Sequence, residues 1–397
     1  MKITMLFIGC ILLHTVTASS KTWECRILPP EHRTEIDARS GAEIIFVTTH
    51  PAHDRNLYFH DRCFLQDDRM MLFISDRYDR SEIMAYLLET GELVRLNRPQ
   101  DAPAGRPLAS IAGDKLYVMR QDTVLQWQVS LSTHPRTRVR VSETPLAVLP
   151  DSAVQVSGLA ENSDASLLAF AYQKAGFHFI DVLDLSSGTV RNAAKLDYAM
   201  NHVQFHWTRP DLLSFSRTYA SDRAPMDADE PLHARFWFLN VNTHVPVPAF
   251  YQDPGELATH ECWWLHDQIT FIGGHNSDGN KEDGHVKVYD LKTGEIRIIG
   301  AGAWWQDGNA SQVARVNWWH AAGSPDGRWV AADNWHGVIA LFDAKTTAQR
   351  ILTTGHRIYG QGAHLHVGWD LKGERVEFTS NKRGNPDVCI GLVPKEW

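Results

Sequence analysis

A repeated hairpin pattern constrains the fold of this chain more than any other feature of its sequence. Each copy has an apolar strand, an acidic or polar residue, a tight turn and a β-branched strand. The clearest copies turn at Thr90-Gly91, Ser187-Gly188 and Thr293-Gly294, and looser ones at Asn242-Thr243 and Thr346-Thr347. A second hairpin, with a turn of Pro, Asp and Gly residues, precedes each of them. The pairs of hairpins repeat at roughly 40 to 55 residues, which is typical of the four-stranded blades of a β-propeller.

Seven such units begin near residues 63, 107, 154, 203, 260, 317 and 366. The last unit is too short for four strands, so we expect a strand from about residues 40–50 (Glu43-Ile-Ile-Phe-Val) to complete it and close the ring. The alternative is a pair of β-sandwich domains, but no linker rich in Pro, Ser or Gly separates two halves of the chain. The sequence therefore predicts an all-β fold, with one seven-bladed β-propeller domain over residues 19–397.

The first 18 residues have the pattern of a signal peptide. Lys2 supplies the positive start, Ile3 to Val16 the apolar run, and Val16-Thr17-Ala18 a cleavage site of small residues. The apolar run is too short to span a membrane comfortably, and no later stretch resembles a span. We therefore expect a protein that is exported, to the periplasm or out of the cell, with no membrane span after cleavage of the signal.

The composition narrows the partners of the mature chain. A net charge of -8 over 397 residues, with no basic run, argues against a nucleic-acid partner. The 20 His and 14 Trp residues suit a cleft that handles sugars, since Trp offers flat apolar faces and His offers protons and metal ligands. Four cysteines follow the signal peptide, none in a C-x-x-C pair. One or two disulfides are possible in an oxidising compartment, and the spacing does not assign them.

A candidate metal-binding motif lies near the end of the chain, at Gln361-Gly-Ala-His364-Leu-His366. Two histidines at i and i+2 lie on the same face of an extended strand, and the flexible link can bring the amide oxygen of Gln361 round to them. Imidazole nitrogens with one neutral oxygen suit a divalent metal such as Mn, Fe, Co, Ni or Zn. The alternative is that one histidine caps a strand and the other fills a wet pocket.

Three more histidines, His202, His260 and His320, occupy corresponding positions just before the inner strands of consecutive units. The loops that enter the innermost strands of a propeller gather at one mouth of its channel, so we expect all of these histidines to meet there. His320 would then complete a site of three histidines and one oxygen. The alternative is that each histidine hydrogen-bonds to a neighbouring blade. Arg235, one strand before the His260 unit, is either solvated or placed to hold a carboxylate.

Several stretches, taken in order, resemble the oligogalacturonate lyases (polysaccharide lyase family 22) over essentially the whole mature chain. They are Arg55-Asn-x-Tyr58-Phe59, His233-Ala-Arg235-Phe-Trp, Thr259-His260-Glu261-Cys-Trp263, His320 before Ser324-Pro-Asp-Gly327, and Gln361-x-x-His364-x-His366. The resemblance implies a seven-bladed propeller that cleaves short pectic uronides by β-elimination, with a Mn-type metal at the site. The His-Leu-His motif departs from the family's typical His-Pro-His, and the export signal departs from its typical cytoplasmic location.

The resemblance also implies a role for single residues. The implied metal ligands are His320, Gln361, His364 and His366; His260 is the Brønsted base, and Arg235 faces the substrate carboxylate and the developing charge. The expected substrate-binding residues are His202, Arg55 and Tyr58. The expected partner is an acidic oligosaccharide and the expected cofactor is a divalent metal, Mn²⁺. Two alternatives stay open: the same chemistry on rhamnogalacturonan or glucuronan fragments, and an exported propeller that binds a glycan or protein without catalysis.

Overall fold

The computed structural model describes residues 20–225, 233–265, 267–275, 284–302, 317–334, 336–356 and 364–397. Regular structure within these ranges is entirely β, in 33 strands with no helix. The predicted signal peptide and Gln361 lie outside the described residues, so both stay predictions. Among the described residues, no helix has the length and apolar character needed to cross a membrane.

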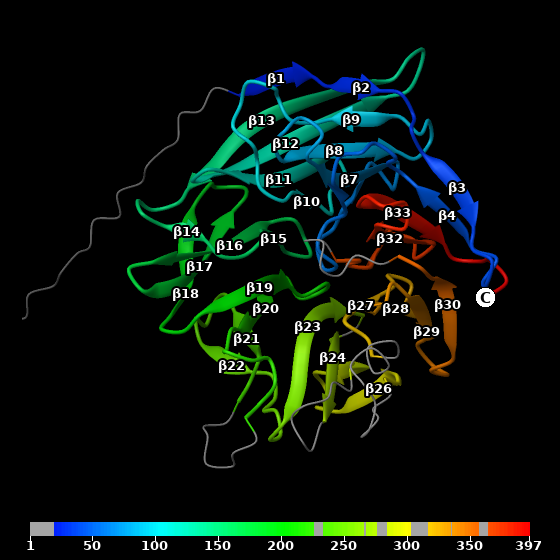
Figure 1. Cartoon of the computed structure of the whole chain (residues 1–397). Helices are drawn as coiled ribbons and strands as arrows, with labels where there is room; N and C mark the ends of the chain where they lie inside the picture. The colour runs from blue at the N-terminus through cyan, green and yellow to red at the C-terminus, as the bar shows by residue number, and fades with distance from the viewer. Residues whose placement is uncertain are drawn as a thin grey trace, which may run out of the picture.

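The strands form seven small antiparallel sheets arranged in a ring (Figure 1). We number these blades 1 to 7 in chain order. Blade 1 contains β5 (Asp54–Arg55), β6 (Phe64–Leu65), β7 (Met70–Ser75), β8 (Glu82–Leu87), β9 (Leu93–Arg95) and β2 (Arg26–Leu28). Blade 2 contains β10 (Leu108–Ala109), β11 (Lys115–Arg120), β12 (Thr123–Ser132), β13 (Arg138–Val148) and β1 (Lys21–Glu24). Blade 3 contains β14 (Val154–Gln155), β15 (Ala160–Glu161), β16 (Leu167–Lys174), β17 (Phe177–Asp184) and β18 (Val190–Leu196).

The second half of the ring follows the same plan. Blade 4 contains β19 (Met200–Phe205), β20 (Leu212–Arg217), β21 (Phe236–Asn240) and β22 (Pro246–Pro248). Blade 5 contains β23 (Glu256–Trp264), β24 (Gln268–His275), β25 (His285–Asp290) and β26 (Ile296–Gly300). Blade 6 contains β27 (His320–Gly323), β28 (Trp329–Asp333), β29 (Ile339–Asp343) and β30 (Gln349–Thr353). Blade 7 contains β31 (Gly368–Trp369), β32 (Arg375–Ser380), β33 (Asp387–Leu392), β4 (Glu43–Phe46) and β3 (Arg33–Ile36), and the predicted seven-bladed propeller is confirmed.

The ring is closed by the N-terminal strand that the sequence predicts. Strand β4 pairs with β33, with Phe46 opposite Cys389 and Ile45 opposite Ile390. The sequence did not reveal two further pairings, in which β2 adds to β9 of blade 1 and β1 adds to β13 of blade 2. The N-terminal segment therefore runs along the outer edges of blades 2, 1 and 7 in turn.

Tryptophans join neighbouring blades near the channel. The indole of Trp263 donates to the carbonyl of Gln204 at 3.3 Å, Trp264 to Ser324 at 2.9 Å, and Trp369 to Ala322 at 2.8 Å. Each ring buries its apolar faces between two sheets while its N–H group finds a backbone acceptor. Part of the Trp content therefore serves blade packing and not a sugar cleft. Cys25, Cys63, Cys262 and Cys389 are all free thiols.

Candidate metal centre

Three histidines from blades 6 and 7 form a cluster at one mouth of the channel. His320 begins β27, and His364 and His366 lie in the segment that leads to β31. One ligand nitrogen from each ring lies within 4.8 Å of the others. The ring centroids of His320 and His366 are 4.6 Å apart, and those of His364 and His366 are 5.2 Å apart. A single divalent ion fits between nitrogens at this spacing.

The alternation of side chains around Leu365 brings the last two histidines together. Leu365 and Val367 are fully buried in the core beside blade 7, and the carbonyl of Leu365 accepts from the Thr379 amide at 3.0 Å. The flanking histidines are therefore turned away from that core. The segment is not the regular strand that the sequence suggested, because His366 has a left-handed backbone with φ of 51°. The Asn56 side chain donates to the His366 carbonyl at 2.6 Å and fixes this conformation.

The orientation of His320 is set by Asp333, which lies opposite it on β28. The Nδ1 atom of His320 is 2.9 Å from one carboxylate oxygen of Asp333 and 3.0 Å from the other, so Nδ1 carries the proton when this carboxylate is ionised. The same carboxylate accepts from the backbone N–H of His366 at 3.0 Å. The Nε2 atom of His320 is buried and has no hydrogen-bond partner. A ring nitrogen with a free lone pair, held by a carboxylate on its other side, is typical of a metal ligand.

The surroundings of His320 and His366 keep these two imidazoles neutral. Burial, reinforced by the neighbouring histidines, lowers the pKa of His320 and of His366 well below the usual value. Burial also raises the pKa of Asp333 to about 8. A cation bound to the imidazoles would favour the ionised form of this carboxylate. The neutral imidazoles of His320 and His366 therefore fit a divalent metal.

His260 and His202 occupy equivalent positions on the innermost strands of blades 5 and 4. Both have a left-handed backbone, with φ of 54° and 53°, at a point where strand register shifts. The sequence placed them just before these strands, whereas they lie within β23 and β19, because a bulge turns each side chain into the channel. The His260 ring lies 4.4 Å from that of His320, and its Nδ1 atom is buried without a partner. Burial lowers the pKa of His260 well below the usual value, so this ring is also neutral.

Arg235 lies behind His202 and is engaged with carboxylates. The Nδ1 atom of His202 is 3.1 Å from Glu261, and the Nε atom of Arg235 is 3.6 Å from the other oxygen of Glu261. The Arg235 guanidinium also pairs with Asp222. Only 4% of Arg235 is exposed. Glu261 and His202 therefore lie between Arg235 and the site.

Residues 56–61 cross the channel as a plug, which the sequence analysis missed. The Tyr58 ring is 4.7 Å from His366 and its hydroxyl is 3.2 Å from Nε2 of His202. The Phe59 ring is 5.4 Å from His320 and 6.0 Å from His260. One segment of blade 1 thus contacts histidines of blades 4 to 7 and forms the floor of the cluster.

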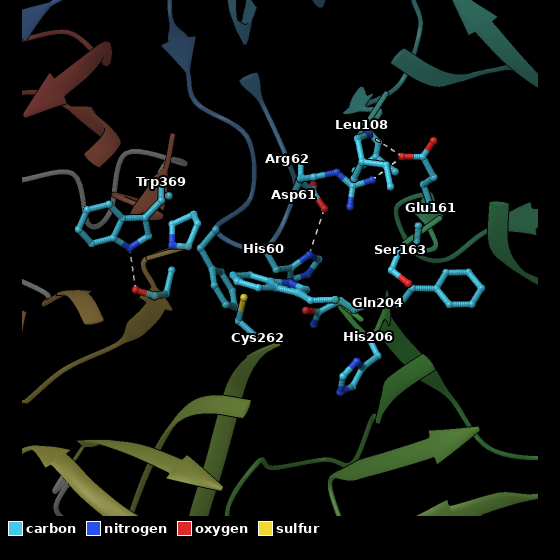
Figure 2. Close-up of a pocket in the computed structure, with 18 of the residues that line it drawn as sticks. His60, Asp61, Arg62, Leu108, Glu161, Ser163, Gln204, His206, Cys262 and Trp369 are labelled. Atoms are coloured by element: carbon cyan, nitrogen blue, oxygen red, sulfur yellow. Dashed lines mark hydrogen bonds and ion pairs between the residues drawn. The ribbon is translucent and has the colours of Figure 1, made fainter. Parts of the chain in front are cut away.

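The side of the plug away from the histidine cluster borders a cavity of about 290 Å³, here called the second cavity. Figure 2 shows His60 near the middle of the channel there, with its dashed contact to Asp61 at 3.0 Å. Beyond it Arg62 pairs with Glu161 at 2.8 Å. The plug therefore separates the histidine cluster from a cavity lined mainly by apolar side chains.

The described site residues that the sequence predicted all lie at or behind one mouth of the channel. Tyr58 and Arg55 line a cavity of about 340 Å³ together with His364 and His366. Three contributors escaped the sequence analysis: Asp333, Glu261 and Arg106. Asp333 was within reach, because counting across the hairpin from the Ser324-Pro-Asp-Gly327 turn places it opposite His320.

Comparisons with known proteins give the fold a counterpart. Protein-family models give no match to the chain, and curated protein sequences give none either. Two solved oligogalacturonate lyases, one from Vibrio parahaemolyticus and one in complex with manganese, match it with TM-scores of 0.74 and 0.75. Each is 16% identical over 94% of this chain, and the match covers 100% and 99% of their own chains. The WD40 domain of Neurospora crassa Pan2 matches less well, with a TM-score of 0.52 and 13% identity over 86% of this chain and 90% of its own.

The fold and the site together define a seven-bladed propeller with a three-histidine cluster. The predicted resemblance to the oligogalacturonate lyases is confirmed at the level of the fold, over nearly the whole chain.

Proposed function

We propose that this chain is a metal-dependent lyase that cleaves short uronate oligomers, first of all oligogalacturonides, by β-elimination to 4,5-unsaturated uronates. One observation carries the proposal. The buried Nε2 atom of His320 has no hydrogen-bond partner within a cluster of three histidines, and the ring of a further histidine, the neutral His260, lies 4.4 Å from the His320 ring. A cluster of metal ligands beside a free base is what abstraction of a proton next to a carboxylate requires.

The cofactor in this proposal is a divalent metal. His320, His364 and His366 would hold it, with Gln361 as the predicted fourth ligand. Imidazole nitrogens with a neutral oxygen suit several divalent first-row metals, and we favour Mn²⁺ because one structural neighbour is a manganese complex. When bound, the metal supplies a positive charge that neutralises the substrate carboxylate and makes the C5 proton more acidic.

The chain's own residues then carry the proton and orient the sugar. The neutral His260 imidazole takes the proton from C5, the C5–H electron pair forms the C4=C5 double bond, and the C4–O pair leaves with the oxygen. The leaving oxygen takes a proton from water. Tyr58, held by His202, bounds the sugar from the plug side. Arg235 adds positive charge behind His202, and direct binding of a carboxylate would require it to release Asp222.

The proposal is tested by metal analysis combined with an ultraviolet assay for the conjugated product on defined oligogalacturonides. His260→Ala should lower kcat by about 10²–10⁴ because it removes the base, while the metal content stays the same. His244→Asn, on an exposed turn of blade 4, is the matched control and should behave like the unaltered protein. If the metal-loaded protein forms no absorbing product from any uronate oligomer, the proposal fails.

The two other candidate functions predict different outcomes. A lyase for another uronate glycan would show its highest kcat/KM on rhamnogalacturonan or glucuronan fragments in the same panel. A binding propeller would hold a glycan without producing double bonds, and His364→Ala would change only its stability. The proposed location outside the cytoplasm is checked by fractionation and by N-terminal sequencing of the mature protein.

A further inference from the structure

The cavity beside the histidine cluster has a wall of arginines. This cavity, of about 340 Å³, is lined by His364 and His366 on one side and by Arg55 and Arg106 elsewhere. A second groove, of about 630 Å³, adjoins it and shares Arg55, Ile74 and Ser81 with it. A continuous path therefore leads from the cluster past Arg55 toward the outside of blade 1.

Arg106 is anchored in a way that leaves its charged end available. Its Nε atom is 2.7 Å from Asp61, and its guanidinium carbon is 5.1 Å from the centroid of the Tyr58 ring. The Arg106 side chain is 36% exposed, whereas that of Asp61 is 6% exposed. An Nε contact leaves the two terminal amino groups, which form a planar fork that suits a carboxylate.

Space for this guanidinium depends on a glycine in the neighbouring blade. A Cβ atom at Gly158 would lie 2.9 Å from Nη2 of Arg106. The backbone of Gly158 is not in the left-handed region, so the lack of a side chain serves the close approach and not the backbone. Gly158 and the plug together hold Arg106 in place.

The other arginines near this path have their charge balanced. Arg77 pairs with Asp54 at 3.0 Å and Arg80 with Glu82 at 2.5 Å. Asp61 is shared between Arg106 and His60, so it offsets the Arg106 charge only in part. Arg55 is exposed and has no carboxylate partner among the described residues. Arg106 and Arg55 are therefore the two cations in this wall that can accept an anionic ligand.

We propose that Arg106, assisted by Arg55, binds the carboxylate of a second acidic sugar, adjacent to the sugar held at the histidine cluster. This inference rests on the proposed function and names the specificity of that site. It favours substrates with carboxylates on adjacent sugars over those in which a neutral sugar alternates with a uronate. Arg106 is a specificity-determining residue here, since it contacts the substrate away from the bond that breaks.

The test compares free and methyl-esterified oligomers. Arg106→Gln should raise KM for a free uronate dimer by about tenfold or more, the loss of one charged hydrogen bond, and leave kcat nearly unchanged. For the dimer esterified on the second sugar, the same variant should differ little from the unaltered protein. Arg106→Lys should lie between the two, because the charge remains but the planar fork is lost.

Two further variants guard the interpretation. Gly158→Ala should raise KM for the free dimer in the same direction by displacing the guanidinium, and it tests the inference if Arg106→Gln does not fold. Arg209→Gln removes a more exposed arginine in blade 4, which also pairs with an aspartate, and should change neither constant. Equal effects of Arg106→Gln on free and esterified dimers, or an unchanged KM, would overturn the inference.

Calorimetric titration with the same dimers separates this inference from the proposed function. If the unaltered protein binds the free dimer without cleaving it, and Arg106→Gln weakens binding about tenfold, the lyase proposal fails and the Arg106 assignment stands. If the protein cleaves oligogalacturonides but Arg106→Gln binds and cleaves both dimers normally, the assignment fails and the lyase proposal stands.

Discussion

Two buried carboxylates, Glu161 and Asp333, lie on opposite sides of the channel plug and differ in their hydrogen-bond networks. Glu161, on the side of the second cavity, accepts from Ser110, Tyr117, Arg62 and the Ile111 amide at 2.6 to 2.9 Å. Asp333, on the other side, holds the Nδ1 atom of His320, whose Nε2 atom is left without a partner. The hydrogen bonds around Glu161 are all made within the protein. Those around Asp333 end at the Nε2 atom of His320, whose lone pair faces the site and has no partner. Burying a polar atom without a partner costs about 1–3 kcal/mol, so the open network marks the side where a ligand completes the structure.

The largest effect is expected from His320→Ala, which tests whether the network around Asp333 serves a metal. The variant removes the ligand that the open network presents, so metal should be lost and lyase activity should fall about 10³-fold, equivalent to several kcal/mol of charge stabilisation. Elemental analysis and the ultraviolet assay, carried out on the same preparation, measure both effects. Full activity of a metal-free His320→Ala protein would show that the cluster is structural.

A smaller effect is expected from Asp333→Asn, which disturbs the residue that orients His320. Metal affinity should fall about 10–100-fold, because the carboxylate behind a ligating histidine fixes its orientation and raises its basicity. Competition with a chelator measures this change. The matched variant is Glu161→Gln, which should destabilise the protein by about 3 kcal/mol through the broken pair with Arg62 and leave metal affinity unaltered. A loss of metal affinity in both variants would erase the distinction between the two networks.

A third buried carboxylate, Glu377 on β32, is expected to affect stability and not the metal. Desolvation outweighs the side chains of Asn56 and Cys63 beside it and raises its pKa from 4.5 to about 8. The folded state thus holds a proton that the unfolded state has lost between these two pH values. The free energy of unfolding should therefore fall as pH rises through this window, by about 1.4 kcal/mol per pH unit from this group.

Glu377→Gln should flatten that dependence, since the amide needs no proton. Urea denaturation at pH 5, 6, 7 and 8, at one fixed metal concentration, measures the slope. Glu374→Gln changes an exposed carboxylate on the turn before β32 and should leave the slope as it is. Identical slopes for the unaltered protein and Glu377→Gln would contradict the assignment.

The fold was largely predictable from the sequence because hairpins are local. The Thr293-Gly294 turn and its counterparts fix each blade within a short span of chain, and the unpaired last unit pointed to β4 as its missing strand. The additions of β1 and β2 were not predictable, since these short strands pair with partners about 70 to 120 residues away and have no turn that announces them.

The candidate site was predictable only in part, because some of its residues are defined by contacts between distant parts of the chain. The His364-Leu365-His366 triplet could be recognised as a pair of ligands, because an apolar residue separates two histidines that then lie on one face. Arg106, within Gly-Arg-Pro, looks like an ordinary surface arginine, and its role depends on Asp61 and Gly158. Neither contact follows from a period or a turn.

The pairing of β4 with β33 also has a consequence for how the chain is made. Residues 43–46 leave the ribosome long before their partner at 387–392 has been synthesised. Until then the edge of β4 that pairs with β33 stays open, and an open edge can pair with another chain. The ring can therefore close only after residues 387–392 have left the ribosome. Any transport of the unfolded chain must be completed before that closure, and the open edge must be protected in the meantime.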